Sequence, residues 1–401
     1  MIERKDYINR LIAFKDKELI KVITGIRRCG KSTLFKLFQE YLLNNGVDKT
    51  QIVNINFEDI EYEDLTDYKT LYKKIISMLL PNKKNYIFLD EIQHVKDFEK
   101  AVDSLFIKKN VDLYITGSNA YFLSGELATL LAGRYVEISM LPLSFKEYNS
   151  ALTEKNISIE RKFNSYLQYG GFPYLLNLQE EQAKRDYLEG IYNSILIKDI
   201  IHRKKISDVS LLEKIIKFMY DNVGNFTSPK KISDTLTSFG QKITSPTVET
   251  YLSALIDGFI LHKVNRYDVL GKQLLKTQGK YYVTDLGLQR FLLNNNKRNI
   301  GHNLENIVFL ELKRRGFQIY IGKIWNLEVD FIAEKNGYTY YFQVSQSVLD
   351  ENTLSRELQP LNKIKDHNPK FLLTMDYFPN ASYNGIRQIN IIDWLLSDDE
   401  N

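Results

Sequence analysis

The first third of the chain alternates short apolar runs with longer amphipathic stretches. The stretch from Lys31 to Asn44 has leucine and phenylalanine at helical spacing and is followed by Gly46, a helix-stop residue. This alternation predicts a parallel α/β sheet in which each strand leads into a crossover helix. The predicted strands are Leu19–Thr24, Gln51–Phe57, Tyr86–Leu89, Val111–Thr116 and Tyr135–Ile138.

A helical pattern follows from Ser144 to about Asp221, interrupted by the sequence GGFP at residues 170–173. Two serine-proline pairs, at 228–229 and 245–246, are typical helix starts with a serine cap and proline in the first turn. Two strand-like runs, Phe259–Asn265 and Lys280–Thr284, come next. Helix, turn, helix and hairpin in this order predict a winged helix.

The last segment predicts a third, α/β unit. Its amphipathic helix begins near Gly301 and ends at Gly316, and four strands follow. We therefore expect four regions, at residues 1–145, 146–222, 223–298 and 299–401. The predicted strands of the last region are Gln318–Ile321, Glu328–Ala333, Tyr338–Val344 and Phe371–Thr374.

Composition narrows the class of protein. The 401 residues are 44% hydrophobic and 26% charged, which is typical of a globular chain with sizeable cores. No apolar run is long enough to span a bilayer and the chain starts with charged residues, so we expect a cytoplasmic protein without a membrane partner. One cysteine, Cys29, and five histidines exclude an intramolecular disulfide and a Cys/His zinc cluster.

Charge is unevenly spread along the chain. The formal net charge is +4, yet residues 196–320 hold 20 lysines and arginines against 11 acidic residues. This basic stretch is where a DNA partner would bind; a solvated lysine and arginine surface is the equally weighted alternative.

The most specific motif is G-x-x-x-x-G-K-[ST], which is the phosphate-binding loop of P-loop nucleotide hydrolases. Its backbone N–H groups can surround phosphates only where the chain turns tightly, hence the glycines at both ends. We expect Lys31 to reach the β- and γ-phosphates of ATP and Ser32 to bind Mg²⁺. The expected ATP-binding residues are Gly25, Ile26, Arg27, Arg28, Cys29, Gly30, Lys31, Ser32 and Thr33.

A second motif is the apolar strand that ends in Asp90-Glu91. Asp90 is expected to hold Mg²⁺ and Glu91 to polarise the water that attacks the γ-phosphate. Ligands of parallel α/β sheets bind at the carboxyl ends of the strands, where the next strand places Ser118 and Asn119. Asn119 or Ser118 is therefore a candidate contact of the γ-phosphate or its water, and a plain polar turn is the alternative.

Arg134 follows the predicted sheet. It is a candidate arginine finger on the γ-phosphate, in its own subunit or in a neighbour's, and the second case requires a homo-oligomer. A surface salt bridge is the alternative.

Together these residues resemble a known family. The phosphate loop, LDEIQ at 89–93, TGS at 116–118, and LAGR at 131–134 followed by LPLSF at 141–145 look like the AAA-type ATPases of prokaryotes. The closest likeness is to the group with a C-terminal domain of unknown function related to restriction endonucleases. GGFP at 170–173, YVTDLGL at 282–288 and GHNLEN at 301–306 continue the likeness over nearly the whole chain.

The resemblance implies an ATP-hydrolysing core, a winged helix and a nuclease-like terminal domain. Glu305 and Asp330 match nuclease metal ligands, but Gln343-Val344-Ser345 stands where Glu-x-Lys is expected. An amide binds a divalent cation more weakly than a carboxylate and serine supplies no charge, so we expect a domain without nuclease activity.

Three hypotheses follow: an ATPase that moves its C-terminal domains, a metal-dependent nuclease using Glu305 and Asp330, and a nucleotide-gated DNA-binding regulator with little turnover. The candidate recognition helix, Ser245–Asp257, contains no lysine or arginine, which disfavours base reading. Basic residues around the hairpin could instead follow a phosphate backbone; they are Lys263, Arg266, Lys272, Lys276 and Lys280. A protein–protein role for this region is equally open.

Overall fold

The structure is a computed structural model. It describes residues 2–117, 131, 133–152, 157–195, 200–201, 206, 208–293, 300–378 and 381–398. Two compact units are present: unit 1 contains residues 1–142 with 257–259, and unit 2 contains residues 143–256 and 260–401.

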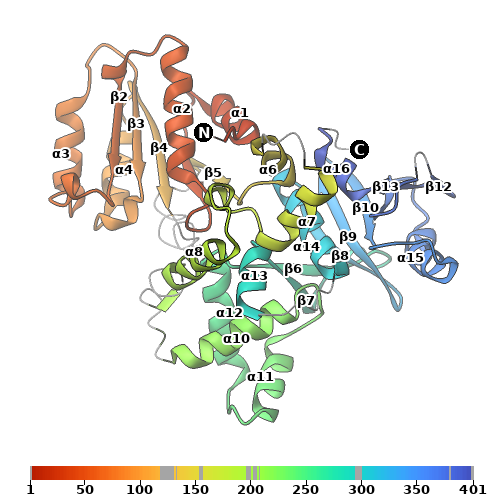
Figure 1. The fold of residues 1–401 in the computed structure, drawn as a ribbon. Helices are drawn as coiled ribbons and strands as arrows, with labels where there is room; N and C mark the ends of the chain where they lie inside the picture. Colours follow the sequence, from red (N-terminus) through yellow and green to blue (C-terminus); the bar gives the residue numbers. More distant parts are fainter. Residues whose placement is uncertain are drawn as a thin grey trace. The chain divides into compact units, whose positions relative to one another are not determined.

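Unit 1 is built on a five-stranded parallel sheet with the order β2-β3-β4-β1-β5 (Figure 1). All five strands predicted from the sequence are present, which confirms an α/β fold of the P-loop type. The strands are β1 (Ile20–Thr24), β2 (Ile52–Asn56), β3 (Asn85–Asp90), β4 (Val111–Gly117) and β5 (Tyr135–Ser139). The helices are α1 (Lys5–Phe14), α2 (Lys31–Asn44), α3 (Tyr68–Met78) and α4 (Phe98–Phe106).

Alternating side chains of the central strands explain why helices cover both faces of this sheet. Ile87 and Leu89 of β3 join an aliphatic core with the buried residues of α3 and α4. The residue between them, Phe88, points the other way and stacks on Tyr114 of β4, with ring centroids 4.8 Å apart. Phe38 of α2 packs on the same two rings.

Unit 2 begins with helices and continues with a mixed sheet (Figure 1). Ser228 caps α11 as predicted, accepting from the Lys231 N–H at 3.2 Å, whereas Ser245 lies within α12 and Thr244 accepts the Thr247 N–H there at 3.4 Å. Ser144 forms a capping box with Glu147. The helices are α6 (Phe145–Ala151), α7 (Ile159–Tyr169), α8 (Glu181–Ser194), α10 (Val209–Asp221), α11 (Pro229–Ser238), α12 (Ser245–Asp257), α13 (Leu286–Leu293), α14 (Ile300–Arg314), α15 (Glu351–Lys363) and α16 (Ile391–Leu396).

The sheet of unit 2 has eight strands in the order β12-β13-β11-β10-β9-β8-β6-β7. The strands are β6 (Leu261–Asp268), β7 (Gln273–Val283), β8 (Gln318–Ile324), β9 (Leu327–Lys335), β10 (Tyr338–Val344), β11 (Lys370–Thr374), β12 (Ser382–Tyr383) and β13 (Ile386–Asn390). The hairpin β6–β7 was expected to belong to a separate winged helix. Instead β6 pairs in parallel with β8, with Arg266 opposite Ile321, so the expected boundary at residues 298/299 does not divide two sheets.

The GGFP turn and the segment before α13 are joined by one buried carboxylate. Asp285 accepts from the Gly171 N–H at 2.7 Å and the Gly287 N–H at 2.8 Å. A Cβ on Gly170 would lie 2.0 Å from the Asp285 carboxylate, and Gly170 has φ 79°, so glycine is required there. Burial raises the pKa of Asp285 to about 7, even though backbone N–H groups favour its ionised form.

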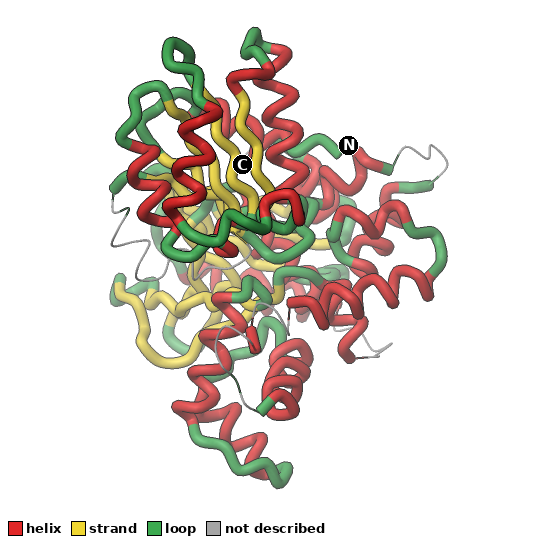
Figure 2. Tube along the Cα trace, turned by 90° about the vertical axis from the view of Figure 1, so that its left-hand side faces the viewer, coloured by secondary structure: helices red, strands yellow, loops and turns green. Residues whose placement is uncertain are grey.

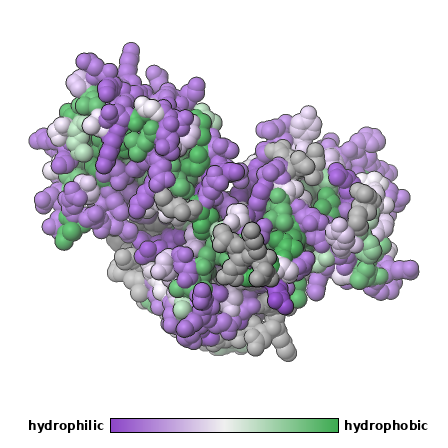
Figure 3. Space-filling model, turned by 45° about the horizontal axis from the view of Figure 1, so that its top comes forward, coloured by the Kyte–Doolittle hydropathy of each residue, from purple (hydrophilic) through white to green (hydrophobic). Residues whose placement is uncertain are grey.

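The surface matches the composition. Hydrophilic residues cover most of the face seen in Figure 3, and the Cα trace in Figure 2 shows strands of the five-stranded sheet of unit 1 with helices beside them. No helix among the described residues is long and apolar enough to cross a membrane.

Candidate functional site

The phosphate loop joins β1 to α2 in unit 1. Gly25 has φ 148°, and a Cβ there would lie 2.2 Å from the Met140 carbonyl oxygen, so the position tolerates glycine alone. Gly30 has φ 107°, also outside the range that ordinary side chains favour. Ile26 and Cys29 are fully buried beneath the loop, and burial raises the pKa of the Cys29 thiol. The two glycines therefore allow the backbone of the loop to turn, and the buried side chains of Ile26 and Cys29 hold the loop against the interior of unit 1.

The Lys31 side chain reaches back to the start of this loop. Its Nζ donates to the Gly25 carbonyl at 3.1 Å and lies 3.6 Å from Glu91 Oε1. The side chain is 4% exposed, so an ammonium with little access to bulk water faces the bend of the loop. This placement suits a group that neutralises phosphate oxygens.

The other expected loop residues divide into two kinds. Arg27 lies against Glu58, with 3.0 Å between Nη1 and Oε1. Arg28, Ser32 and Thr33 are exposed around the loop and the first turn of α2. The described structure thus leaves Ser32 accessible and ties Arg27 to the segment after β2.

Asp90 and Glu91 lie at the carboxyl end of β3, beside the loop. Asp90 is 4% exposed, and burial raises its pKa despite hydrogen bonds from the Ser32 and Thr116 hydroxyls. Glu91 has a left-handed backbone, with φ 55°, which the Thr116 hydroxyl stabilises by accepting the Glu91 N–H at 2.9 Å. The structure therefore brings Lys31, Ser32, Asp90 and Glu91 together, as the sequence predicted.

Arg134 is placed elsewhere. Its carbonyl accepts the Ile20 N–H at 2.8 Å, so it lies where β1 begins, whereas the phosphate loop follows the end of β1. The guanidinium pairs with Asp103 and lies over the Phe106 ring. A finger acting on the nucleotide of its own chain is inconsistent with this position at the opposite edge of the sheet. Ser118 and Asn119 lie outside the described residues.

Sequence reasoning missed Arg4. Its guanidinium donates to the Cys29 carbonyl at 3.1 Å and to the Leu141 carbonyl at 2.8 Å, and the side chain is almost fully buried. Tyr7 supports the same contact by accepting the Leu141 N–H at 3.0 Å. Arg4 belongs to no sequence motif. Its contact with the phosphate loop becomes visible only in the folded structure, where α1 packs beside the loop.

A second group of charged residues lies in unit 2. The carboxylates of Glu305, Glu328 and Asp330 lie within 4.8 Å of one another. Lys280 stands among them, with its Nζ 2.8 Å from Glu305 Oε1 and also paired with Glu328. The Tyr282 hydroxyl donates to Glu305 at 2.5 Å. The resemblance pointed to Glu305 and Asp330 but not to Glu328 or Lys280.

Burial and charge act together on this group. Burial alone would lower the pKa of Lys280, but the carboxylates of Glu305, Asp330 and Glu328 raise it instead. Burial and the charge of Glu305 raise the pKa of Asp330 well above its ordinary value. The expectation that Lys280 contacts a phosphate backbone is thus wrong, because the side chain is buried and committed to carboxylates.

Gln343 and Ser345 do not complete a nuclease site. The Gln343 amide donates to Glu357 at 2.8 Å and the Ser345 hydroxyl donates to the Ser347 carbonyl at 3.2 Å. The hairpin lysines Lys263 and Lys272 are exposed, and Arg266 stacks on Phe226 with 4.5 Å between its guanidinium carbon and the ring centroid. The Lys276 side chain lies outside the described part of the structure.

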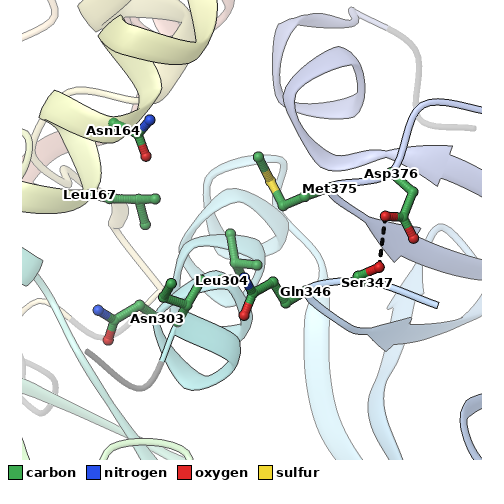
Figure 4. A pocket seen from close by; sticks show the side chains of 9 residues that line it. Asn164, Leu167, Asn303, Leu304, Gln346, Ser347, Met375 and Asp376 are labelled. Carbon is green, nitrogen blue, oxygen red and sulfur yellow. Dashed lines mark hydrogen bonds between the residues drawn. The ribbon is translucent and has the colours of Figure 1, made fainter. Parts of the chain in front are cut away.

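A pocket of about 300 Å³ lies between α7, α14 and the segments that follow β10 and β11 (Figure 4). Leu167, Leu304 and Met375 supply apolar walls. Its carboxylate, Asp376, already accepts from the Ser347 hydroxyl at 2.8 Å and the Val348 N–H at 2.7 Å. Both oxygens of this carboxylate are therefore already hydrogen-bonded within the protein.

Comparisons with known proteins agree with the fold of unit 1. Residues 17–149 match a family described as an AAA domain, and residues 160–299 match a domain of unknown function. An uncharacterized protein of Haemophilus influenzae is 42% identical over 403 residues, with 99% of each chain covered. An uncharacterized protein of Methanocaldococcus jannaschii is 33% identical, with 90% of this chain and 82% of the relative covered.

Among solved structures, the Walker-type ATPase of Pyrococcus abyssi aligns with a TM-score of 0.50 at 17% identity, covering 73% of this chain and 96% of that one. This likeness concerns the fold alone. The chain belongs to the same family as the Haemophilus and Methanocaldococcus proteins, and its first part is an AAA domain of the P-loop ATPase type.

Proposed function

We propose that the protein binds and hydrolyses ATP with Mg²⁺, and that the nucleotide state changes the conformation of its C-terminal part. The main observation behind this proposal is that Lys31, Asp90 and Glu91 lie together at the carboxyl edge of one parallel sheet. They lie beside a loop whose tight turn requires glycine. Cation, metal-binding carboxylate and general base are the three groups that phosphoryl transfer to water requires.

Each group has a role set by its position. The loop N–H groups and Lys31 would bind the phosphates, and the 3.6 Å contact between Lys31 and Glu91 would weaken as the ammonium turns to them. Ser32 and Asp90 would hold Mg²⁺, which supplies charge neutralisation when bound; the hydrogen bond between their side chains supports this pairing. Glu91 would accept a proton from the attacking water.

The assignment of Arg134 as a catalytic residue rests on a homo-oligomer. Because Arg134 lies at the opposite edge of its own sheet, it could reach a γ-phosphate only in a neighbouring subunit, after leaving Asp103. A partly exposed guanidinium, with 47% of the side chain accessible, is available for such a contact. Mixing Arg134→Ala protein with Lys31→Ala protein tests this: recovered turnover supports action in trans.

Two variants test the ATPase itself. Lys31→Ala should abolish ATP binding, measured by titration with a fluorescent ATP analogue, because the cation facing the phosphates is gone. Glu91→Gln should bind ATP but lose most phosphate release, because an amide accepts no proton. Lys36→Ala, an exposed lysine on the same helix, is the matched control and should behave as wild type. Undiminished turnover by Lys31→Ala would refute the proposal.

DNA is the macromolecular partner that we propose, and a protein partner is the alternative. With Lys280 buried, the exposed hairpin residues Lys263 and Lys272 carry this proposal. Phosphate release measured with duplex and with single-stranded DNA distinguishes a DNA-stimulated ATPase from the regulator hypothesis, in which ATP is bound with negligible turnover.

The nuclease hypothesis is not favoured. Lys280 already neutralises the carboxylates that would bind a metal, and Gln343 is engaged with Glu357. Nicking of DNA by purified protein in Mn²⁺, lost in Asp330→Ala, would restore that hypothesis.

A further inference from the structure

Gln93 lies two residues after Glu91, in a short 3-10 turn formed by Ile92–His94. Its amide nitrogen donates a hydrogen bond to Glu91 Oε2, while the other carboxylate oxygen lies 3.6 Å from Lys31 Nζ. A carboxylate accepts but does not donate, so the Gln93 amide must present its nitrogen to Glu91. Its carbonyl oxygen is therefore turned away from that carboxylate.

The Gln93 carbonyl oxygen is a hydrogen-bond acceptor that lacks a donor. Gln93 Oε1 is buried and accepts no hydrogen bond from any described residue. A buried acceptor without a donor costs free energy, and such groups usually mark the place of a water molecule or a functional contact. Here the acceptor belongs to a side chain that is hydrogen-bonded to the proposed general base.

A water that attacks phosphorus has two hydrogens and must keep one lone pair aimed at the phosphorus atom. Glu91 accepts only one of these hydrogens, the one that is transferred to it as a proton. A second fixed acceptor removes the remaining rotation of the water, which is the orientational contribution that positioned groups make to catalysis. Glu91 is one such acceptor, and the carbonyl oxygen of Gln93, which is hydrogen-bonded to Glu91 and has no donor among the described residues, is the candidate for the second.

We propose that Gln93 is a further catalytic residue of ATP hydrolysis: its N–H fixes Glu91, and its carbonyl oxygen accepts the second hydrogen of the attacking water. The inference rests on the proposed ATPase function. The water oxygen bonds to the γ-phosphorus and one water proton passes to Glu91. The bond from phosphorus to the β–γ bridging oxygen breaks, and ADP leaves with the electron pair.

A structural role for Gln93 is the competing explanation. Its one described side-chain hydrogen bond is to Glu91, and the turn itself is closed by backbone bonds, including the His94 N–H to the Glu91 carbonyl at 3.2 Å. Removing the amide should therefore leave the turn in place. The effect should appear in kcat and not in ATP affinity.

The test compares kcat, from phosphate release, with the ATP dissociation constant in wild type, Gln93→Leu and Gln93→Met; the methionine variant keeps the side-chain length in case leucine disturbs folding. Both should lower kcat about 10- to 100-fold, with ATP affinity within about twofold of wild type. Gln39→Leu is the matched control, since Gln39 bonds Asn54 on the surface at 2.9 Å.

Coupling to Glu91 provides the decisive measurement. Because Gln93 acts on the water that Glu91 deprotonates, Glu91→Gln combined with Gln93→Leu should be no slower than Glu91→Gln alone. Wild-type kcat in the Gln93 variants, a parallel loss of ATP affinity, or additive losses in the double variant would each overturn the inference while the ATPase assignment stands. Absence of turnover in wild type would overturn both.

Discussion

Lys280 offers a sharp test of how unit 2 is stabilised. Substituting Lys280→Met removes the ammonium from among Glu305, Glu328 and Asp330 and retains most of the side-chain volume. Two ionised carboxylates no more than 4.8 Å apart repel each other by at least about 3 kcal/mol at an effective dielectric constant of about 20. Breaking one partner from a buried ion pair typically costs about 3–5 kcal/mol.

We therefore expect Lys280→Met to lower the free energy of unfolding of unit 2 by about 3–5 kcal/mol at neutral pH. The loss should shrink in acid, where protonation of a carboxylate relieves the repulsion. Adding Glu305→Gln should recover part of the stability, because it removes one of the charges left unpaired.

The assay is urea unfolding followed by tryptophan fluorescence. The two tryptophans of the chain, Trp325 and Trp394, both belong to unit 2, so the signal reports that unit without contribution from the ATPase domain. Lys263→Met makes the same change at an exposed position of the same hairpin and should alter stability by no more than about 0.5 kcal/mol. Equal stability of the Lys280 and Lys263 variants would refute the reasoning.

Two further changes test contacts that sequence motifs did not reveal. Arg4→Leu removes a hydrogen bond to the Cys29 carbonyl of the phosphate loop and another to the Leu141 carbonyl after β5, so ATP affinity should fall about fivefold or more in a binding titration, whereas the exposed Arg10→Leu should leave it unchanged. Unaltered affinity in Arg4→Leu would contradict a role in shaping the loop. Asp285 binds a proton in the folded state up to about pH 7, whereas the unfolded chain loses it near pH 4, so its contribution to stability falls as pH rises between these values. The stability difference between wild type and Asp285→Asn, from tryptophan fluorescence, should shift against wild type by on the order of 4 kcal/mol from pH 4 to pH 7. A pH-independent difference would refute the raised pKa.

The parts that sequence predicted correctly are locally encoded. The strand before the phosphate loop, the glycines at 25 and 30 and the helix Lys31–Asn44 follow from a continuous stretch of chain, and the structure places each within a residue or two of expectation. Asp90 and Glu91 were found for a similar reason, because parallel strands bring their carboxyl ends to one edge.

The residues that sequence missed depend on packing between distant segments. Arg4 donates to the carbonyl of Leu141, which lies 137 positions later in the chain. Lys280 on β7 pairs with Glu328 on β9, although β6 and β8 lie between these two strands in the order of the sheet. A lysine in a basic stretch is ordinarily exposed, so charge counting assigned Lys280 to the surface. Knowing that β6 pairs with β8 would have been enough to question that assignment.

This pairing also restricts how unit 2 can respond to ATP. β6 is joined to β8 through the register Arg266–Ile321 to Asp268–Lys323, and β7 carries Lys280 into the carboxylates of α14 and β9. Moving the hairpin away from the terminal strands would break ladder hydrogen bonds and leave buried carboxylates without their cation. Conformational coupling in the proposed ATPase therefore has to move the hairpin and the terminal strands as one body, or else release Lys280 from Glu305 and Glu328.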